Sequence, residues 1–460
     1  MKKYDLAILG GGPGGYVAGI YASQLGLKTC VIEKNLVGGT CLNRGCIPTK
    51  VMLHAASMLR KLKKCSEFGV HVGSVSFDLP ALLHTRDATV HRLRNGIESL
   101  FKANKVDLVR GMGTFLSEKA LDVDGEQISA DNIIVATGSR PLELPALKFS
   151  GETVVSSEGA LASTTAPASI LIVGGGVIGC EFAQFYCAIG RKVTIVELAD
   201  RILPTLSREI SKKMEVLFRK DGVSIRASTK VESINMVKGS VSAMLSDGSV
   251  VESERVLVSV GRTPNSDTIG LEKAGVATDR SRIVVNERLE TSVAGIWAIG
   301  DVINGPMLAH AASYEGILAC DNIAGGNRPA NFSLIPSCVY TDPGIATVGM
   351  SEDEAKKYIP GARTAKFPYR ASSKANIMGS IDGHIKIIGG PDRKILGVEI
   401  FGEDAYELIG EASLAMSSGL SVDDLAHAVH CHPTLSEMYH DTARLFIGKP
   451  IHTVKSKHDT

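Results

Sequence analysis

Two glycine-rich segments, each directly after a short apolar run, constrain the fold of this chain more than any other feature. The first is YDLAIL followed by GGGPGG, in which Gly10, Gly12 and Gly15 fit the pattern G-x-G-x-x-G. The second is ILIV followed by GGGVIG, and its matching glycines are Gly174, Gly176 and Gly179. A strand, a glycine turn and a helix predict a Rossmann-type unit that holds a dinucleotide pyrophosphate at the helix N-terminus. The chain therefore contains the same predicted unit twice.

An acidic residue follows each glycine turn at the same distance. Glu33 lies 33 − 10 = 23 residues after the first glycine of its turn, and Glu197 lies 197 − 174 = 23 residues after the other. A carboxylate near this spacing accepts a hydrogen bond from a ribose hydroxyl. The alternative is a pair of structural repeats with empty sites, and the two acids argue against it. We expect two dinucleotide cofactors in one chain, which suggests electron transfer between them.

A cysteine pair follows the first unit, in the stretch GGTCLNRGCIPTK. Cys41 and Cys46 are five positions apart, which is the wrong step for sharing one face of a regular helix. A bond between them needs a distorted first helical turn, which Gly45 and Pro48 allow. The chain has nine cysteines, so this spacing alone does not distinguish a redox pair from two small buried thiols.

Composition excludes several classes of partner. Fifty basic and 49 acidic residues give 50 − 49 = +1, so the charge offers no case for nucleic acid or for a membrane surface. No apolar stretch is long enough to span a membrane, and no signal peptide precedes the first glycines. We expect a cytoplasmic protein, in which a lasting disulfide is catalytic rather than structural. We expect no metal site.

The order of apolar runs predicts an α/β chain with two Rossmann-like domains and a C-terminal α+β domain. Residues 51 to 104 are mainly helical, and GIWAIGDV is a strand that ends in Asp301, which either binds a ligand hydroxyl or caps a helix. Strands and turns mix with helices from about Ile335. The predicted domains are 1–143 for the first dinucleotide domain, 144–265 for the second, 266–334 for a central part that completes the first site, and 335–460 for the C-terminal domain.

These motifs, together with HPTLSE near the C-terminus, resemble the FAD-dependent pyridine nucleotide disulfide oxidoreductases over essentially the full length. CIPTK, ELADRILPTLSREI and GPMLAHAA are closest to the members that oxidise dihydrolipoyl groups. The resemblance implies an FAD site and an NAD site. The implied FAD residues are Gly10, Gly12, Gly14, Gly15, Glu33, Thr40, Lys50, Gly113, Thr137, Gly138, Ser139, Asp301 and Ala309. The implied NAD residues are Gly174, Gly176, Val177, Ile178, Gly179, Glu197 and Gly261.

The resemblance also implies the catalytic groups. Cys41 would be the thiol that meets the substrate and Cys46 the one against the flavin, while His432 would be the base, oriented by Glu437. The family places a Lys and Glu pair near the flavin ring, which matches Lys50 and Glu181. From the sequence alone, a solvated Lys50 and a surface Glu181 fit as well. His430 is either a supporting group or a mere neighbour.

The implied reaction is oxidation of protein-bound dihydrolipoyl groups, carried by 2-oxoacid dehydrogenase or glycine cleavage complexes, with NAD as acceptor. In the family the base comes from the partner subunit, so a homodimer is expected. Glu197 would repel a 2′-phosphate, which favours NAD over NADP, and Arg201 is the residue that argues otherwise. Two alternatives stay open, a glutathione- or mercuric-reductase-like enzyme and a flavin-binding subunit without catalysis. Cys431 and Asp404 depart from the family pattern.

Overall fold

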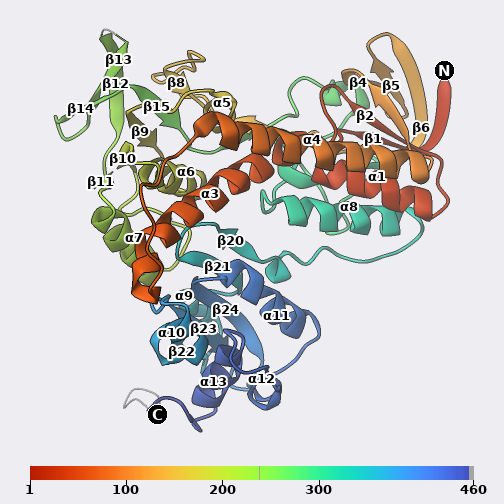
Figure 1. The fold of residues 1–460 in the computed structure, drawn as a ribbon. Helices are drawn as coiled ribbons and strands as arrows, with labels where there is room; N and C mark the ends of the chain where they lie inside the picture. The colour runs from red at the N-terminus through yellow and green to blue at the C-terminus, as the bar shows by residue number, and fades with distance from the viewer. Residues whose placement is uncertain (238, 455–460) are drawn as a thin grey trace. The chain divides into compact units, whose positions relative to one another are not determined.

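The computed structural model describes residues 1–237 and 239–454, which form two compact units (Figure 1). One unit contains Met1–Leu198 and Val223–Phe332. The other contains Ala199–Gly222 together with the chain from Ser333 onward. Residues 455–460 of the predicted C-terminal domain lie outside the described residues.

A seven-stranded sheet in the first unit carries the first glycine turn. Its order is β3-β2-β1-β6-β5-β4, and β19 pairs with the C-terminal part of β6, beyond the residues that pair with β5. The strands are β1 (Lys2–Leu9), β2 (Thr29–Glu33), β3 (Asp107–Arg110), β4 (Gly113–Ser117), β5 (Ala120–Val123), β6 (Glu126–Val135) and β19 (Ile296–Ala298). The pairs β1–β2, β1–β6, β2–β3 and β6–β19 are parallel. The predicted Rossmann unit is confirmed, and its last parallel strand comes from about 160 residues further along the chain.

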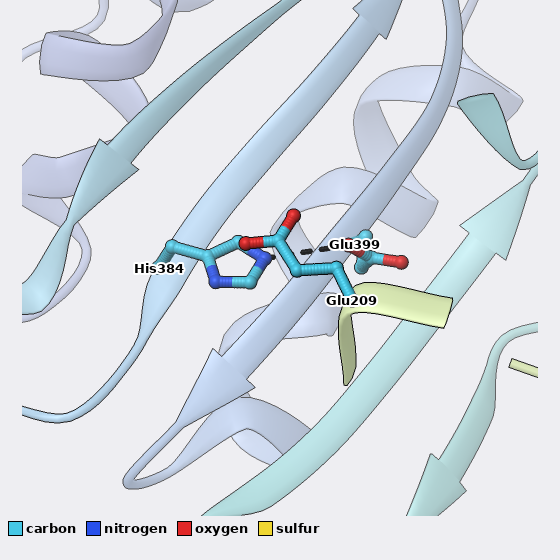
Figure 2. A group of neighbouring side chains, drawn as sticks. All are labelled: Glu209, His384 and Glu399. Atoms are coloured by element: carbon cyan, nitrogen blue, oxygen red, sulfur yellow. Dashed lines mark hydrogen bonds and ion pairs between the residues drawn. The ribbon is translucent and has the colours of Figure 1, made fainter. Parts of the chain in front are cut away.

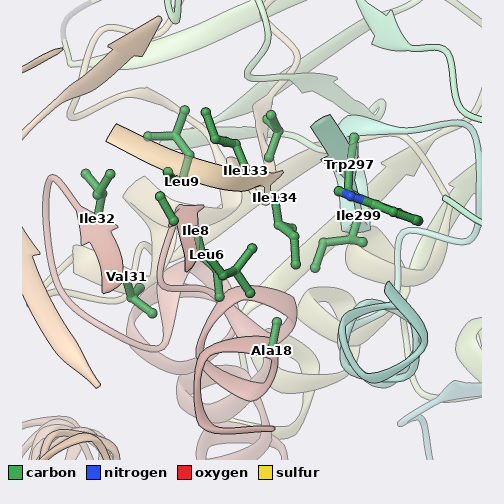
Figure 3. Close-up of a cluster of buried hydrophobic side chains, with 14 of the residues drawn as sticks. Leu6, Ile8, Leu9, Ala18, Val31, Ile32, Ile133, Ile134, Trp297 and Ile299 are labelled. Carbon is green, nitrogen blue, oxygen red and sulfur yellow. The ribbon is translucent and has the colours of Figure 1, made fainter. Parts of the chain in front are cut away.

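Continuous apolar runs explain why these strands lie in the middle of the sheet. Leu6, Ile8 and Ile134 are fully buried, as strands covered on both faces require (Figure 3). Helix α1 (Pro13–Gln24) packs against α8 (Ala309–Ile323) through residues without bulk. A Cβ on Gly14 would lie 3.0 Å from the Ala312 carbonyl oxygen. The glycine-rich sequence therefore sets how closely these two helices approach.

The second glycine turn lies in a five-stranded sheet of order β11-β10-β9-β15-β8. The strands are β8 (Val154–Val155), β9 (Ser169–Val173), β10 (Lys192–Val196), β11 (Ser224–Arg226) and β15 (Arg255–Val258). A separate antiparallel sheet contains β12 (Val231–Val237), β13 (Ser240–Leu245) and β14 (Val250–Ser253). Two short strands, β7 (Ser139–Pro141) and β16 (Arg262–Pro264), pair where the chain leaves and re-enters the first domain.

This unit contains further helices besides α1 and α8. They are α2 (Gly39–Arg44), α3 (Cys46–Lys64), α4 (Leu79–Ala103), α5 (Ser157–Ala162) and α6 (Val177–Ala188). Helix α3 contacts α2, α4 and α6. The helical prediction for residues 51 to 104 is confirmed, except for the connection between α3 and α4. Within the described residues, no helix is both long and apolar enough to cross a membrane.

The second unit is built on a five-stranded antiparallel sheet of order β20-β21-β24-β23-β22. The strands are β20 (Ser337–Val339), β21 (Gly344–Gly349), β22 (Arg363–Pro368), β23 (His384–Gly389) and β24 (Ile395–Gly402). The helices are α7 (Arg208–Lys220), α9 (Glu352–Tyr358), α10 (Ser373–Ile377), α11 (Ala405–Ser417), α12 (Val422–His427) and α13 (Glu437–Phe446). The buried stripe of α11, with Ile409 and Ala412, faces the core of this sheet. The predicted α+β type is confirmed for this unit.

Replacing Gly15 by alanine should destabilise the first unit. A Cβ on Gly15 would lie 1.8 Å from the Gly10 carbonyl oxygen, so the glycine turn would have to move. We expect a loss of about 2 kcal/mol or more in the free energy of unfolding, measured by urea denaturation. Gly96→Ala is the matched control because its Cβ meets nothing within 4 Å in α4. That control should gain about 0.5–1 kcal/mol. Equal stability of the two variants would contradict the prediction.

Candidate active site

The cysteine pair lies where α2 ends and α3 begins. Gly45 separates the two helices with φ −145° and ψ −109°, and a Cβ there would lie 2.9 Å from the Thr40 carbonyl oxygen. This close approach folds the chain back, so the Cys46 thiol meets the Cys41 thiol. The distorted turn expected from the spacing is therefore present. Both cysteines are half-buried, and the Cys41 thiol is in hydrogen-bond contact with Cys46, as a redox pair requires.

The two thiols differ in acidity. The hydrogen bond from Cys41 is the largest influence on Cys46 and, together with the charge of Lys50, lowers the pKa of Cys46 to about 7 against the effect of burial. The same contact with Cys46, together with burial, raises the pKa of Cys41. Cys46 is therefore the first of the two to become a thiolate, while Cys41 keeps its proton. A thiolate is the reactive form in disulfide exchange and electron donation.

Lys50 of α3 forms an ion pair with Glu181 of α6. Its Nζ lies 2.8 Å and 3.0 Å from the two carboxylate oxygens, and the Glu181 side chain is only 4% exposed. The solvated Lys50 and surface Glu181 that the sequence also allowed are wrong. Because a buried carboxylate needs a partner, this pair fixes a cation close to Cys46.

The first glycine turn has the shape that a dinucleotide needs. Gly10 has φ +114°, and a Cβ there would lie 2.3 Å from the Ala136 carbonyl oxygen. Helix α1 starts after Gly12 without a side-chain cap, so its N-terminus faces the turn unblocked. Glu33 accepts hydrogen bonds at 2.8 Å from the backbone N–H groups of Gly11 and Asn35. A side chain at Gly10 or Gly15 would fill this cradle, so the residues present fit a bound pyrophosphate.

The other predicted FAD residues lie on neighbouring elements. Thr40 is in α2, Lys50 is in α3 and Gly113 begins β4. Thr137, Gly138 and Ser139 follow the end of β6, and Ala309 begins α8. All of these elements belong to the first unit.

Asp301 lies at the end of β19, in the 3-10 turn η3 (Gly300–Val302). Its carboxylate accepts a hydrogen bond from the Ser139 hydroxyl at 2.5 Å and does not cap the turn, so the capping alternative is wrong. Arg262 donates to the same hydroxyl at 2.6 Å. Glu158 forms ion pairs with two arginines. Its carboxylate lies 3.5 Å from Arg262 and 3.2 Å from Arg44 of α2. No local pattern in the sequence indicates Arg262, Glu158 or Arg44, because these contacts join positions more than a hundred residues apart.

The second glycine turn repeats the first. Gly174 has φ +102°, a Cβ on Gly179 would lie 2.0 Å from the Gly174 carbonyl oxygen, and α6 starts after Gly176 without a side-chain cap. Glu197 accepts from the Gly175 N–H at 2.6 Å. Val177 and Ile178 form the first turn of α6, and Gly261 follows β15 with φ +130°. These residues fit a second dinucleotide.

Arg201 belongs to the second unit and is held within its own segment. Its guanidinium donates to the Asp200 carboxylate at 2.8 Å and to the Pro204 carbonyl at 2.9 Å. Two of its donors are therefore engaged by neighbours in the chain.

His432 and Glu437 form a pair near the start of α13. The His432 Nδ1 lies 2.9 Å from the Glu437 carboxylate, which also accepts from the Thr434 N–H at 2.8 Å. Burial opposes ionisation of Glu437, but these hydrogen bonds hold its pKa below the ordinary value. The His432 side chain is 70% exposed, and Val429 in the same loop is 98% exposed. His430 instead pairs with Glu411 at 2.7 Å and is 10% exposed, so it supports the loop.

One further cluster in the described residues has metal-ligand types, namely Glu209, His384 and Glu399 (Figure 2). The Lys386 ammonium lies 3.3 Å from Glu209 and 3.1 Å from Glu399, so a cation already neutralises these carboxylates. The cluster is a charge network that attaches α7 to the sheet of the second unit.

Comparisons with known proteins agree with this arrangement. Residues 4–316 match the family model described as pyridine nucleotide-disulphide oxidoreductase, and residues 335–443 match its dimerisation domain. The dihydrolipoyl dehydrogenase of Bacillus subtilis is 42% identical over 98% of this chain and 99% of its own. The mitochondrial dihydrolipoyl dehydrogenase of Pisum sativum is 42% identical over 97% of this chain and 92% of its own.

Solved structures of two related proteins have the same fold. LpdA from Mycobacterium tuberculosis superimposes with a TM-score of 0.91 at 26% identity, covering 96% of this chain and 99% of its own. The flavoprotein disulfide reductase RclA from Escherichia coli, as its Cu(II) complex, superimposes with a TM-score of 0.87 at 27% identity, covering 97% and 100%.

Replacing Lys50 by methionine should raise the pKa of Cys46 above about 7, since the nearby cation is lost and Glu181 keeps a buried negative charge. Thiolate alkylation of Cys46 at neutral pH should slow by about fivefold, the effect of a one-unit rise in pKa. The rate can be followed against pH by mass spectrometry of the Cys46 peptide in the anaerobically reduced chain. Lys63→Met, an exposed position on the same helix, should leave the profile unchanged. Identical profiles for both variants would contradict the role of Lys50.

Proposed function

Because this chain belongs to the pyridine nucleotide-disulphide oxidoreductase family, we propose that it oxidises protein-bound dihydrolipoyl groups to the lipoyl disulfide with NAD⁺ as acceptor. This is the reaction of a dihydrolipoamide dehydrogenase. The observation that carries the proposal is the thiol pair, in which Cys41 donates to Cys46 beside the Lys50 cation. Full-length relatives named dihydrolipoyl dehydrogenase support the same substrate.

The cofactors of this proposal are FAD in the first dinucleotide site and NAD in the second. When bound, FAD takes two electrons from the reduced cysteine pair and passes them to NAD⁺. Gly10, Gly12, Gly14 and Gly15 would hold its pyrophosphate, with Glu33 on the adenosine ribose and Asp301 on the ribityl chain. Further FAD contacts are proposed for Thr40, Lys50, Gly113, Thr137, Gly138, Ser139 and Ala309. The proposed NAD contacts are Gly174, Gly176, Val177, Ile178, Gly179, Glu197 and Gly261.

The chemistry of the cysteines follows from their different acidity. A substrate thiolate attacks the Cys41 sulfur of the oxidised pair, and the sulfur–sulfur bond breaks to release Cys46 as the thiolate. The second substrate thiolate then attacks the sulfur of the substrate in this mixed disulfide, which forms the lipoyl disulfide and releases Cys41. Cys41 leaves with a proton, as its raised pKa requires. The two electrons of the substrate now reside on the Cys41 and Cys46 pair.

His432 is the proposed base that accepts the substrate thiol proton and returns it to Cys41. Glu437 holds the ring through Nδ1, which leaves Nε2 for the substrate. The exposure of His432 and Val429 supports a loop that a second copy of the chain covers, and the matched dimerisation domain favours a homodimer. We propose that His432 serves the cysteine pair of the partner subunit.

NAD is the proposed acceptor rather than NADP. Glu197 presents a carboxylate where a 2′-phosphate would be repelled. Arg201 is the residue that could favour NADP. Its guanidinium donates hydrogen bonds to the Asp200 carboxylate and the Pro204 carbonyl instead.

The lipoyl groups of 2-oxoacid dehydrogenase or glycine cleavage complexes are the proposed partners, and a cytosolic location is part of the same proposal. The substrate distinguishes this proposal from a glutathione- or mercuric-reductase-like enzyme, because only the proposed enzyme oxidises dihydrolipoyl groups.

The domain boundaries 1–143, 144–265, 266–334 and 335–460 also stay predictions.

The purified chain should reduce NAD⁺ with dihydrolipoamide. We expect its kcat/KM with NAD⁺ to exceed that with NADP⁺ by about tenfold or more, the cost of one repelled phosphate contact. The measurement is steady-state absorbance of the reduced nucleotide, with glutathione disulfide and NADPH as the competing pair. Activity with that pair alone would overturn the proposal.

His432→Gln should lower kcat by a factor of about 10² to 10⁴, since proton transfer to a positioned base is lost. Bound FAD, measured by its visible absorbance, should be unchanged because His432 has no part in the flavin site. His427→Gln is the control, since His427 is an exposed histidine at the end of α12 that bonds its own helix. Unchanged turnover in His432→Gln would instead support a flavin-binding subunit without catalysis.

A further inference from the structure

Glu315 is a fully buried carboxyl group in the first unit that the redox chemistry does not use. It lies in the middle of α8 and has no exposed surface. One carboxyl oxygen accepts a hydrogen bond from the Gly300 N–H. The other oxygen, Oε1, is buried and has no hydrogen-bond partner among the described residues. A buried polar atom of this kind calls for an explanation.

The bond from Gly300 fixes the turn that carries Asp301. Gly300 has φ +73°, the left-handed conformation, and its N–H is the only backbone donor that Glu315 engages in the described residues. Asp301, the next residue, accepts from Ser139 at 2.5 Å. Glu315 therefore bonds the backbone of the turn that carries Asp301, the residue proposed for the flavin site.

Helix α8 also lies against the pyrophosphate end of the first Rossmann unit. A Cβ on Gly316 would lie 2.7 Å from the Gly14 carbonyl oxygen, in the first turn of α1. Glu315 is adjacent to Gly316 in this helix. Helix α8 therefore contacts both the Asp301 turn and the helix that would receive the phosphates.

Among the described residues, no cation forms an ion pair with Glu315 to balance a negative charge. Burial raises the pKa of Glu315 to about 7, the Gly300 N–H opposes this rise, and the charge of Asp301 adds to it. Helix α1 contributes no charged side chain, and its titratable groups are Tyr16 and Tyr21. The loop 303–308 has none. Asp301 is the charged group that acts on Glu315, and two arginines lie beyond it: Arg262 is 3.9 Å from Asp301, and Arg282 donates to the Ile303 carbonyl at 2.8 Å.

We propose that Glu315 is a positioning residue whose neutral carboxyl group holds the Gly300–Asp301 turn for the flavin and makes flavin binding depend on a proton. This inference rests on the proposed function, because it takes the first dinucleotide site to be the FAD site. The pyrophosphate of FAD brings further negative charge to the end of α1, which disfavours an ionised Glu315. FAD binding therefore favours the protonated chain, and FAD affinity falls as the pH rises through neutrality.

The test is an FAD titration of the chain freed of flavin, followed by quenching of flavin fluorescence at pH values from about 6 to 9. For the unaltered chain we expect the Kd to rise by about tenfold over this range, the effect of a one-unit rise in the pKa of Glu315 on binding. Glu315→Gln keeps an acceptor for Gly300 without a charge, so its Kd should rise with pH by several-fold less than that of the unaltered chain. Glu315→Leu leaves the Gly300 N–H buried and unpaired, so it should bind FAD at least about tenfold more weakly at every pH.

Glu118→Gln is the control, since Glu118 is an exposed acid in the same unit and should keep the pH dependence of the unaltered chain. The inference is overturned if Glu315→Gln keeps that pH dependence, or if Glu315→Leu binds FAD as well as the unaltered chain. If the folded, unaltered chain binds no FAD, the proposed function fails. If every variant binds FAD equally at all pH values, only the role of Glu315 fails.

Thermal unfolding of the flavin-free chain gives a second reading that does not depend on the leucine variant. The pKa of Glu315 is higher in the folded chain than the ordinary value of 4.5, so its contribution to stability is complete below about pH 4.5 and is lost as the pH rises through about 7. Glu315→Gln should remove this loss, so its Tm should fall less between about pH 5 and pH 8. Parallel Tm profiles for the two proteins would overturn the inference.

Discussion

The ion pair between Lys50 and Glu181 is the interaction on which the redox centre depends. It joins α3, which begins at Cys46, to α6, which begins at the second glycine turn. Because Glu181 is buried, its charge is tolerable only with the Lys50 ammonium beside it. The same ammonium favours the thiolate of Cys46, which the hydrogen bond from Cys41 also favours. The helix that begins at Cys46 is therefore linked to the helix that begins at the second glycine turn through a single pair of opposite charges.

The fold could be predicted from the sequence to the extent that its signals are local. A glycine turn needs φ values that other residues avoid, so Gly10 and Gly174 mark both Rossmann units by themselves. The capping box of Ser421 and Asp424 and the stop at Gly419 involve only neighbours in the chain, and the structure contains both. The break at Gly45 belongs to the same class, because it brings together residues only five positions apart.

The candidate site is harder to predict from the sequence than the fold, because its contacts join distant parts of the chain. Glu181 looked like a surface residue of a helix, and only the approach of Lys50 from 131 positions away makes it part of the redox centre. Arg262 reaches Ser139 across 123 positions, and Glu315 reaches Gly300 across 15 positions that include a loop and two turns of α8. The sequence indicates Asp301 as a candidate site residue, but whether it caps a helix or binds a ligand depends on the position of Ser139. Spacing in one sequence carries no information on such pairs.

The charge network of Lys386 has a consequence for how this protein can be divided. Glu209 on α7 is bound to Lys386 on β23, so Ala199–Gly222 belongs to the second unit although β10 and β11 on either side of it belong to the first. The backbone passes between the units three times, near residues 198, 222 and 332. A single cut or a single recombination point near residue 332 would therefore separate Glu209 from Lys386 and α7 from the rest of its unit. Exchange of the C-terminal unit between relatives would have to carry α7 with it, as a second and discontinuous piece.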